Sequence, residues 1–187
     1  MIPVLLGLGS NREYKGFSSI ELLASACREL GGIIAEPVIS SVYESKAMYV
    51  TEQENFYNMA VKGFVEDSMS PFRFLKLINE IEAALGRDRS KEARFGPRPL
   101  DIDIEEFGSQ TINSAELVIP HPRIKEREFV LIPALEILNE SADSKVWETL
   151  NFYLKSLSPQ GVKKCPDTTQ LLFKKLYEGG CYGNKTC

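Results

Sequence analysis

The sequence predicts an α+β fold in which helices pack against one face of an antiparallel sheet. Strand-like segments, recognised by apolar runs or by alternation, fall at residues 4–8, 33–43, 56–65 and 100–104. Amphipathic helical segments separate them, and further apolar segments with helical spacing follow in the last third of the chain. The order strand, helix, strand, strand, helix, strand indicates helices laid on an antiparallel sheet.

The first helix has a marked start and a marked stop. Ser18 and Glu21 form a capping box, in which each side chain bonds the backbone N–H of the other. Apolar residues follow at helical spacing as far as Leu30, and the two glycines at positions 31 and 32 end the helix. The apolar run before it, residues 4–8, predicts a buried strand.

The second and third strands flank a long polar segment. Residues 33–43 predict a strand that Pro37 places at a sheet edge, and residues 44–55 lack periodicity, which is typical of loops that cover binding sites. Residues 56–65 alternate and predict a third strand. One of its faces carries Phe56, Asn58 and Ala60, and the other carries Tyr57, Met59 and Val61.

Helical signals recur in the rest of the chain. Ser70 followed by Pro71 predicts a helix start, and Gly86 ends that helix. Residues 129–138 and 147–157 predict two more helices. We therefore expect a ferredoxin-like βαββαβ core with C-terminal helical additions, which together form one domain over residues 1–157, followed by a C-terminal extension of unassigned role at residues 158–187.

The composition restricts the class of function. The chain is 43% hydrophobic and 26% charged with a net charge of −4, which is typical of a globular protein and argues against broad electrostatic binding of nucleic acid. It has no apolar run of membrane-spanning length, no basic start like that of a signal peptide, and no metal-binding spacing among its four cysteines. We expect a cytoplasmic protein that binds small molecules, not nucleic acid or membrane, as a monomer, with a dimer as the alternative.

Residues 86–108 carry the strongest chemical signal. The first part concentrates cations in an acidic chain, which indicates an anionic partner: Arg87, Arg89, Lys91, Arg94 and Arg98. The second part alternates, so Asp101 and Asp103 share one strand face about 6–7 Å apart. Such a carboxylate pair can bind hard divalent cations, and beside arginines it predicts phosphoryl transfer. A solvated strand face next to a wet loop is the alternative.

Four segments together resemble the 6-hydroxymethyl-7,8-dihydropterin pyrophosphokinase family of folate biosynthesis. They are GLGSN at residues 7–11, FYNMAV at 56–61, RFGPRPLDIDI at 94–104 and PHPRIKEREFVLIPALEI at 120–137. The resemblance implies a ferredoxin-like fold and transfer of the pyrophosphoryl group from ATP, the co-substrate, to the hydroxymethyl oxygen of the pterin. It also implies two Mg²⁺ ions and the products AMP and pterin diphosphate.

The same resemblance implies roles for the residues at matched positions. Asp101 and Asp103 look like the two magnesium ligands, and Arg87 and Arg98 like arginines of a mobile catalytic loop. The implied ATP contacts are Glu82, Arg87, Arg89, Arg98, Ile104, His121, Pro122 and Arg127. The implied pterin contacts are Ser45, Ala47, Met48, Phe56, Asn58, Phe95 and Phe129, of which the phenylalanines at 56 and 129 resemble two aromatic walls around the flat ring.

For several of these residues, a purely structural or solvent-exposed role is the alternative. Glu82 could be an ordinary charge on a helix surface, and His121 could be a turn histidine bonded to a nearby backbone group. For the three remaining basic residues of the loop, a solvated position is the alternative: Arg89, Lys91 and Arg94.

Two stretches depart from the family pattern. Ser45, Ala47 and Tyr49 replace a T-x-P-x-G pattern, which predicts a loop of altered stiffness. Glu105 and Glu106 stand where apolar residues are common. Alternation places Glu105 on the face of the two aspartates, where we hypothesise that it tunes the metal site. The same alternation places Glu106 on the apolar face, unless a bulge follows Ile104 or the strand end is wet.

Three other functions stay open at this point. A different two-metal nucleotide enzyme could also carry paired aspartates on a strand, but the Phe56, Asn58 and Phe129 pocket argues against it. A non-catalytic RNA-binding sheet conflicts with the net acidity and the paired aspartates. A degenerate homologue that binds its ligands without turnover is compatible with the altered loop.

Overall fold

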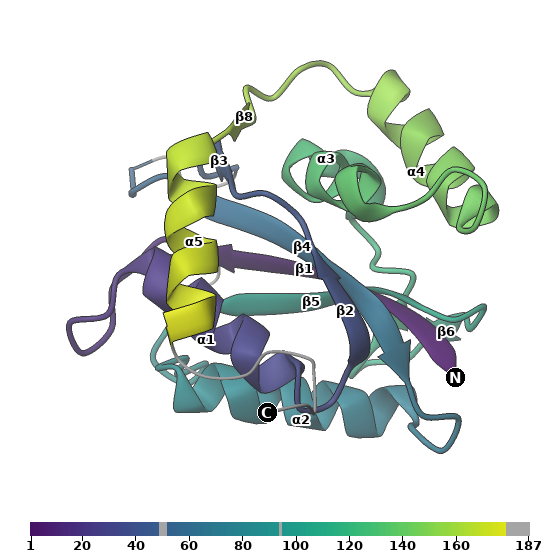
Figure 1. Ribbon diagram of the computed structural model, residues 1–187, viewed down its shortest axis with the longest axis horizontal. Helices are drawn as coiled ribbons and strands as arrows, with labels where there is room; N and C mark the ends of the chain where they lie inside the picture. Colours follow the sequence, from purple (N-terminus) through teal and green to yellow (C-terminus); the bar gives the residue numbers. More distant parts are fainter. Residues whose placement is uncertain (49–51, 94, 179–187) are drawn as a thin grey trace.

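The computed structural model in Figure 1 describes residues 1–48, 52–93 and 95–178. Its main sheet has the strand order β5-β1-β4-β3-β8, and β2 also pairs with β4. The strands are β1 (Ile2–Ser10), β2 (Ala35–Ile39), β3 (Tyr43–Ser45), β4 (Phe56–Val65), β5 (Asp101–Phe107) and β8 (Lys163–Lys164). The helices are α1 (Ser19–Leu30), α2 (Pro71–Ala84), α3 (Glu128–Ile137), α4 (Ser144–Ser156) and α5 (Pro166–Glu178). A small hairpin of β6 (Ile112–Asn113) and β7 (Val118–Ile119) precedes the short 3-10 helix η1 (Ile124–Glu126).

Strand β1 lies between β4 and β5 and sets the register of the candidate site. It pairs antiparallel with β4 on one side and with β5 on the other, so that Gly9 lies opposite both Asn58 and Asp101. A Cβ atom on Gly9 would lie 3.3 Å from Asn58 Oδ1, so the missing side chain leaves room for this amide. The register therefore brings the FYNMAV strand and the aspartate strand to one end of the sheet.

Helices cover both faces of this sheet (Figure 1). Alternation along β1 sends Leu6 into a core with α1, α2 and α5, and sends Leu5 into a second core with α3 and α4. The prediction of helices on one face thus holds for α1 and α2. Of the later helices, α5 lies on that same face, whereas α3 and α4 cover the other face. The fold is a mixed α/β arrangement around an antiparallel sheet, as the sequence predicts.

Most local predictions are confirmed. The capping box of Ser18 and Glu21 is present at the start of α1, and β4 has the predicted bounds. The single strand predicted over residues 33–43, with an interruption at Pro37, is instead two strands, because β2 runs through Pro37 and the break before β3 lies at residues 40–42. Ser40 lies between them, and its Oγ accepts a hydrogen bond from the backbone N–H of Ala60 at 2.9 Å. A side-chain oxygen thus takes the place of a ladder bond, and the strand pairing is interrupted.

Residues 163–178, in the predicted C-terminal extension, belong to the same sheet and core. Strand β8 pairs with β3, and Thr169 Oγ1 accepts a hydrogen bond from the Val42 N–H at 2.9 Å. Helix α5 buries Leu172 and Leu176 in the core that α1 shares. The sequence indicated no structural role for β8. Among the described residues, no helix combines the length and the apolar character needed to cross a bilayer.

A β-bulge decides where the two consecutive glutamates of β5 point. Leu6 pairs with Ile104 and Leu5 pairs with Glu106, so Glu105 is the extra residue. The predicted alternative of a bulge after Ile104 is therefore confirmed. Glu106 faces the α4 side of the sheet, where burial raises its pKa to about 7.

Candidate functional site

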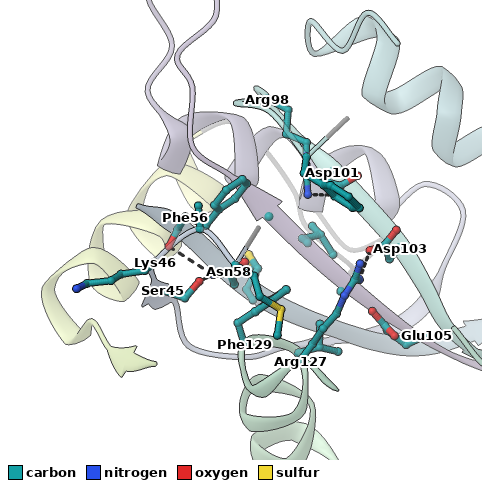
Figure 2. A pocket seen from close by; sticks show the side chains of 18 of the residues that line it. Ser45, Lys46, Phe56, Asn58, Arg98, Asp101, Asp103, Glu105, Arg127 and Phe129 are labelled. Carbon is teal, nitrogen blue, oxygen red and sulfur yellow. Dashed lines mark hydrogen bonds and ion pairs between the residues drawn. The ribbon is translucent and has the colours of Figure 1, made fainter. Parts of the chain in front are cut away.

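A pocket opens over β1, β4 and β5 on the face that α3 covers (Figure 2). All seven residues predicted to contact a pterin line it: Ser45, Ala47, Met48, Phe56, Asn58, Phe95 and Phe129. Strand β4 presents Phe56 and Asn58 on the predicted face. Helix α3 places Phe129 at the pocket from its first turn. Tyr49, the third departure in the second loop, lies outside the described residues.

Asn58 is the polar group at the base of this pocket. Its side chain is buried, and its Nδ2 donates a hydrogen bond to Ser45 Oγ at 2.9 Å. This bond joins β4 to β3 and sets the orientation of the amide, because a buried amide needs its partners satisfied. The departure at Ser45 therefore has a defined role in the structure.

Each of the two predicted aromatic walls has a guanidinium over its ring. Arg98 lies 5.1 Å from the ring centroid of Phe56, and Arg127 lies 5.7 Å from that of Phe129. The space left in this pocket is about 60 Å³. Since ligand pockets are usually several times larger, a flat bicyclic ligand requires side chains or loop residues to move.

The two aspartates are paired with arginines in this state. Arg87 Nη1 and Arg98 Nη2 each lie 2.6 Å from a carboxylate oxygen of Asp101. Arg127 Nη1 donates to Asp103 Oδ2 at 2.8 Å. Burial alone would raise the pKa of Asp101, but Arg98 and Arg87 outweigh it and the net shift is downward. The carboxylate is therefore held in its charged form.

A second cavity of about 360 Å³ adjoins the first, and four of the ten described residues that line it are arginines. Both aspartates line both cavities. The arginines around the second cavity are Arg87, Arg89, Arg98 and Arg127. The predicted catalytic residues are thus brought together where the two cavities meet.

The donor set fits a hard divalent cation. Asp101 and Asp103 supply carboxylate oxygens from one strand face, which Mg²⁺ prefers. Within the described ranges, no group of three or more His, Cys, Asp or Glu side chains could hold a metal ion. Mg²⁺ is commonly bound through one or two carboxylates, with water and substrate phosphates completing its coordination.

Glu82 is an interior residue, so the surface-charge alternative is wrong. It is only 1% exposed, and its Oε1 accepts a hydrogen bond from the Ile102 N–H at 2.8 Å. It also pairs with Arg87 and Arg89. Glu82 therefore ties α2 to β5 and to the basic loop, while its predicted contact with ATP stays a prediction.

His121 lies in the proline-flanked turn beside Asp103. Its Nδ1 accepts a hydrogen bond from the Arg123 N–H at 3.2 Å, which assigns the proton of a neutral ring to Nε2. Nε2 lies 4.0 Å from Asp103 Oδ2. Burial lowers the pKa of His121, against the opposing effect of Asp103. A neutral donor is thus available close to Asp103.

Other predicted residues lie further from the pockets. The Ile104 side chain is buried in the core on the opposite face, so only its backbone could contact a nucleotide, and Pro122 is exposed in the turn next to His121. Lys91 is 82% exposed and pairs with Asp88, in agreement with the solvated alternative. Arg94 lies outside the described residues.

Asn11 is a residue that the sequence analysis did not single out. Its Oδ1 accepts from the Arg98 N–H at 2.9 Å, and its Nδ2 donates to Gln53 Oε1 at 3.0 Å. Gln53 in turn donates to the Phe95 carbonyl at 3.0 Å. Asn11 therefore connects β1 to both loops over the site. In the sequence, the position of Asn11 at the end of the GLGSN segment was the signal that could have identified it.

Comparison with known proteins identifies relatives of this chain. The profile of the 7,8-dihydro-6-hydroxymethylpterin-pyrophosphokinase (HPPK) family matches residues 5–139. A 2-amino-4-hydroxy-6-hydroxymethyldihydropteridine pyrophosphokinase of Bacillus subtilis is 43% identical over 102 residues, 54% of this chain and 59% of the relative. The enzyme of the same name from Methylorubrum extorquens is 34% identical over 166 residues, 88% of this chain and 99% of the relative.

Other relatives are much longer. The mitochondrial folate synthesis bifunctional protein of Arabidopsis thaliana is 37% identical over 79% of this chain, but only 26% of that protein is covered. A crystal structure of Plasmodium falciparum HPPK-DHPS superimposes with a TM-score of 0.62 at 14% identity, over 83% of this chain and 45% of the other, which shows a shared fold. The profile match and the bacterial relatives together show that this chain belongs to the 7,8-dihydro-6-hydroxymethylpterin-pyrophosphokinase family.

Proposed function

We propose that this protein transfers the pyrophosphoryl group of ATP to the hydroxymethyl oxygen of 6-hydroxymethyl-7,8-dihydropterin, giving AMP and the pterin diphosphate used in folate biosynthesis. One observation supports this most directly. The aromatic pocket and the arginine-lined cavity adjoin, and Asp101 and Asp103 line both. A flat heterocycle and a triphosphate could therefore meet at the two carboxylates.

The aromatic pocket suits a pterin. Phe56 and Phe129 can stack on the two faces of a bicyclic ring, each adding about 1 kcal/mol beyond burial. The Asn58 amide can both donate and accept, as the amino-pyrimidinone edge requires. Ser45 already orients that amide.

The arginine-lined cavity suits the phosphates. Guanidinium groups bind phosphate and carboxylate oxygens in the same geometry, so a triphosphate competes with Asp101 for Arg87 and Arg98. Asp101 and Asp103 are the residues that would hold two Mg²⁺ ions, which supply charge neutralisation and alignment for in-line displacement. His121 Nε2–H adds a neutral donor near Asp103.

The proposed reaction forms one bond and breaks one. The pterin hydroxymethyl oxygen attacks the β-phosphorus of ATP, the bond from that phosphorus to the oxygen bridging it to the α-phosphate breaks, and AMP leaves. The hydroxyl loses its proton, for which the ionised carboxylate of Asp101 is a candidate acceptor. The arginines released from the aspartates can then stabilise charge on the phosphates.

The fold assignment of the core, the bounds of the catalytic unit, the oligomeric state and the location are proposals as well. The order β5-β1-β4 followed by β2 and β3, with α1 and α2 on one face, supports a ferredoxin-like assignment of the core. We propose that residues 1–157 carry the catalytic unit and that residues 158–187 extend it. We further propose that the protein acts as a cytoplasmic monomer on small molecules.

An AMP-release assay with ATP, Mg²⁺ and the hydroxymethyl-dihydropterin tests this function. We expect AMP formation that depends on both the pterin and Mg²⁺. Turnover of ATP without the pterin would instead indicate another kind of two-metal nucleotide enzyme. Binding of both ligands without release of AMP would indicate a non-catalytic homologue.

The C-terminal extension reaches the site through Gln160. Its backbone N–H donates to Glu128 Oε2 at 2.6 Å, its Oε1 accepts from the Glu128 N–H at 3.1 Å, and its Nε2 donates to the Glu126 carbonyl at 2.8 Å. These bonds hold the start of α3, where Phe129 lies. Gln160 and Phe129 also line a common cavity beside the aromatic pocket.

Substitution Gln160→Ala is expected to raise the KM for the pterin by roughly tenfold while kcat changes by less than about twofold, because lost hydrogen bonds loosen the wall that binds the ring. Steady-state kinetics with saturating ATP measure both constants. Gln170→Ala, an exposed position on α5, is the matched control. Equal KM values for the two variants would show that the extension does not position α3.

A further inference from the structure

Glu105 is a buried carboxyl group without a hydrogen-bond partner. Its side chain is 0% exposed, and within the part of the chain that the structure describes neither Oε1 nor Oε2 forms a hydrogen bond. Burial, followed by the charge of Asp103, raises its pKa well above the usual value. A buried polar group left unpaired is costly and calls for an explanation.

Two features of the backbone make room for this group. The bulge in β5 inserts Glu105 as an extra residue on the pocket side. Gly7 lies next to it, and a Cβ atom there would approach Glu105 Oε1 to 3.0 Å. The carboxyl group lines the same pocket as Asp101 and Asp103. It is therefore held at the site rather than in the hydrophobic core.

His121 Nδ1 lies 3.9 Å from Glu105 Oε2, but in the neutral ring it carries no proton and already accepts from the Arg123 N–H. The complementary donor is therefore the guanidinium of Arg127. Within the described residues its only ion pair is with Asp103, and its Nε is buried with no hydrogen-bond acceptor. Figure 2 shows the side chains of Asp103 and Glu105 both pointing toward the side chain of Arg127. Electrostatic attraction between Arg127 and Glu105 is present, although they form no ion pair. The Arg127 guanidinium, which has an N–H without an acceptor, thus lies near the two Glu105 oxygens, which have no donor.

The proposed function gives Asp103 two competing tasks. In this state its carboxylate accepts from Arg127 at 2.8 Å. A carboxylate oxygen that binds a divalent cation is a weaker hydrogen-bond acceptor for a guanidinium. Arg127 must therefore pair with another acceptor or move away from this position. Moving an arginine this deep into an unpaired state would carry a large desolvation cost.

We propose that Glu105 is the positioning residue that accepts the Arg127 guanidinium when Asp103 engages a metal-bound nucleotide. The inference rests on the proposed function. It needs no particular protonation state, since a carboxyl oxygen accepts a hydrogen bond whether or not the group is ionised. Glu105 thereby keeps Arg127 beside the phosphates and leaves Asp103 available. In the nucleotide-free state it stays unpaired, at a cost in stability.

This assignment predicts that removal of the Glu105 carboxyl raises thermal stability but weakens Mg²⁺-dependent nucleotide binding. In Glu105→Met, an apolar side chain of similar volume replaces the unpaired carboxyl, so the midpoint of thermal unfolding should rise by a few degrees, about 2–4 °C. Arg127 then has no alternative acceptor and continues to compete for Asp103. The Mg²⁺ concentration for half-maximal binding of α,β-methylene-ATP should rise roughly tenfold or more.

Isothermal titration calorimetry with α,β-methylene-ATP at several Mg²⁺ concentrations measures this requirement without turnover. Glu105→Gln keeps an oxygen acceptor and should recover most of the Mg²⁺ affinity. Glu106→Gln, the neighbouring glutamate, which lines a separate cavity beside α4, is the matched control and should leave the Mg²⁺ requirement unchanged.

Several results would overturn the inference. An unchanged Mg²⁺ requirement in Glu105→Met contradicts it, as does a fall in the unfolding midpoint, which would make Glu105 an ordinary structural residue. A change confined to pterin affinity would assign Glu105 to the pterin instead. If the wild type binds the analogue but makes no AMP, the proposed function is wrong. The Mg²⁺ dependence of analogue binding still tests the role of Glu105. A wild type that binds no analogue overturns both.

Discussion

Replacement of Asp103 with alanine is expected to reduce AMP release by roughly a thousandfold, because metal-assisted charge neutralisation contributes several kcal/mol to phosphoryl transfer. The carboxylate lines both cavities and is one of two candidates on its strand face. Its removal also leaves Arg127 without its ion-pair partner. Single-turnover assays at saturating ATP and pterin measure the loss.

The fold of this variant is checked by circular dichroism, and Asp167→Asn, an exposed aspartate at the start of α5, serves as the control for charge. We expect Asp101→Ala to lose as much activity as Asp103→Ala. It should also perturb the basic loop, because Arg87 and Arg98 both pair with this residue. Activity within tenfold of the wild type in both variants would remove the two-carboxylate site from the mechanism.

Replacement of Glu82 with alanine is expected to lower the free energy of unfolding by about 3–5 kcal/mol, the usual cost of breaking a buried ion pair from one side. The substitution leaves the Ile102 N–H without its acceptor and Arg87, only 11% exposed, with fewer anionic partners. Urea unfolding measures the change. The expected loss is a large part of the total stability of a domain of this size.

Glu80→Ala on the same helix is the matched control, since Glu80 is 60% exposed and pairs only weakly with Lys76 at 4.0 Å. It should change the free energy of unfolding by less than about 1 kcal/mol. Equal destabilisation by the two substitutions would contradict the role assigned to Glu82. A second consequence concerns ATP, whose KM should rise in Glu82→Ala because Arg87 and Arg89 lose a common anchor.

Much of the fold could be predicted because its signals are local. The capping box of Ser18 and Glu21 and the alternation along β4 depend on residues a few positions apart, and both are present in the structure. The same holds for the shared face of Asp101 and Asp103. The strand break at Ser40 could not be predicted, since it depends on a hydrogen bond to Ala60, twenty residues away.

The sequence by itself determined most of the helices and central strands, the paired carboxylates and the family resemblance, because each rests on short-range spacing or on motifs within single segments. Only the tertiary structure decided that Glu82 is buried, that Arg127 pairs with Asp103, and that Gln160 braces the start of α3. It also decided that the later helices divide between the two faces of the sheet. The physical reason is that burial and ion pairing depend on which distant segments pack together, and no local pattern of residues encodes that choice.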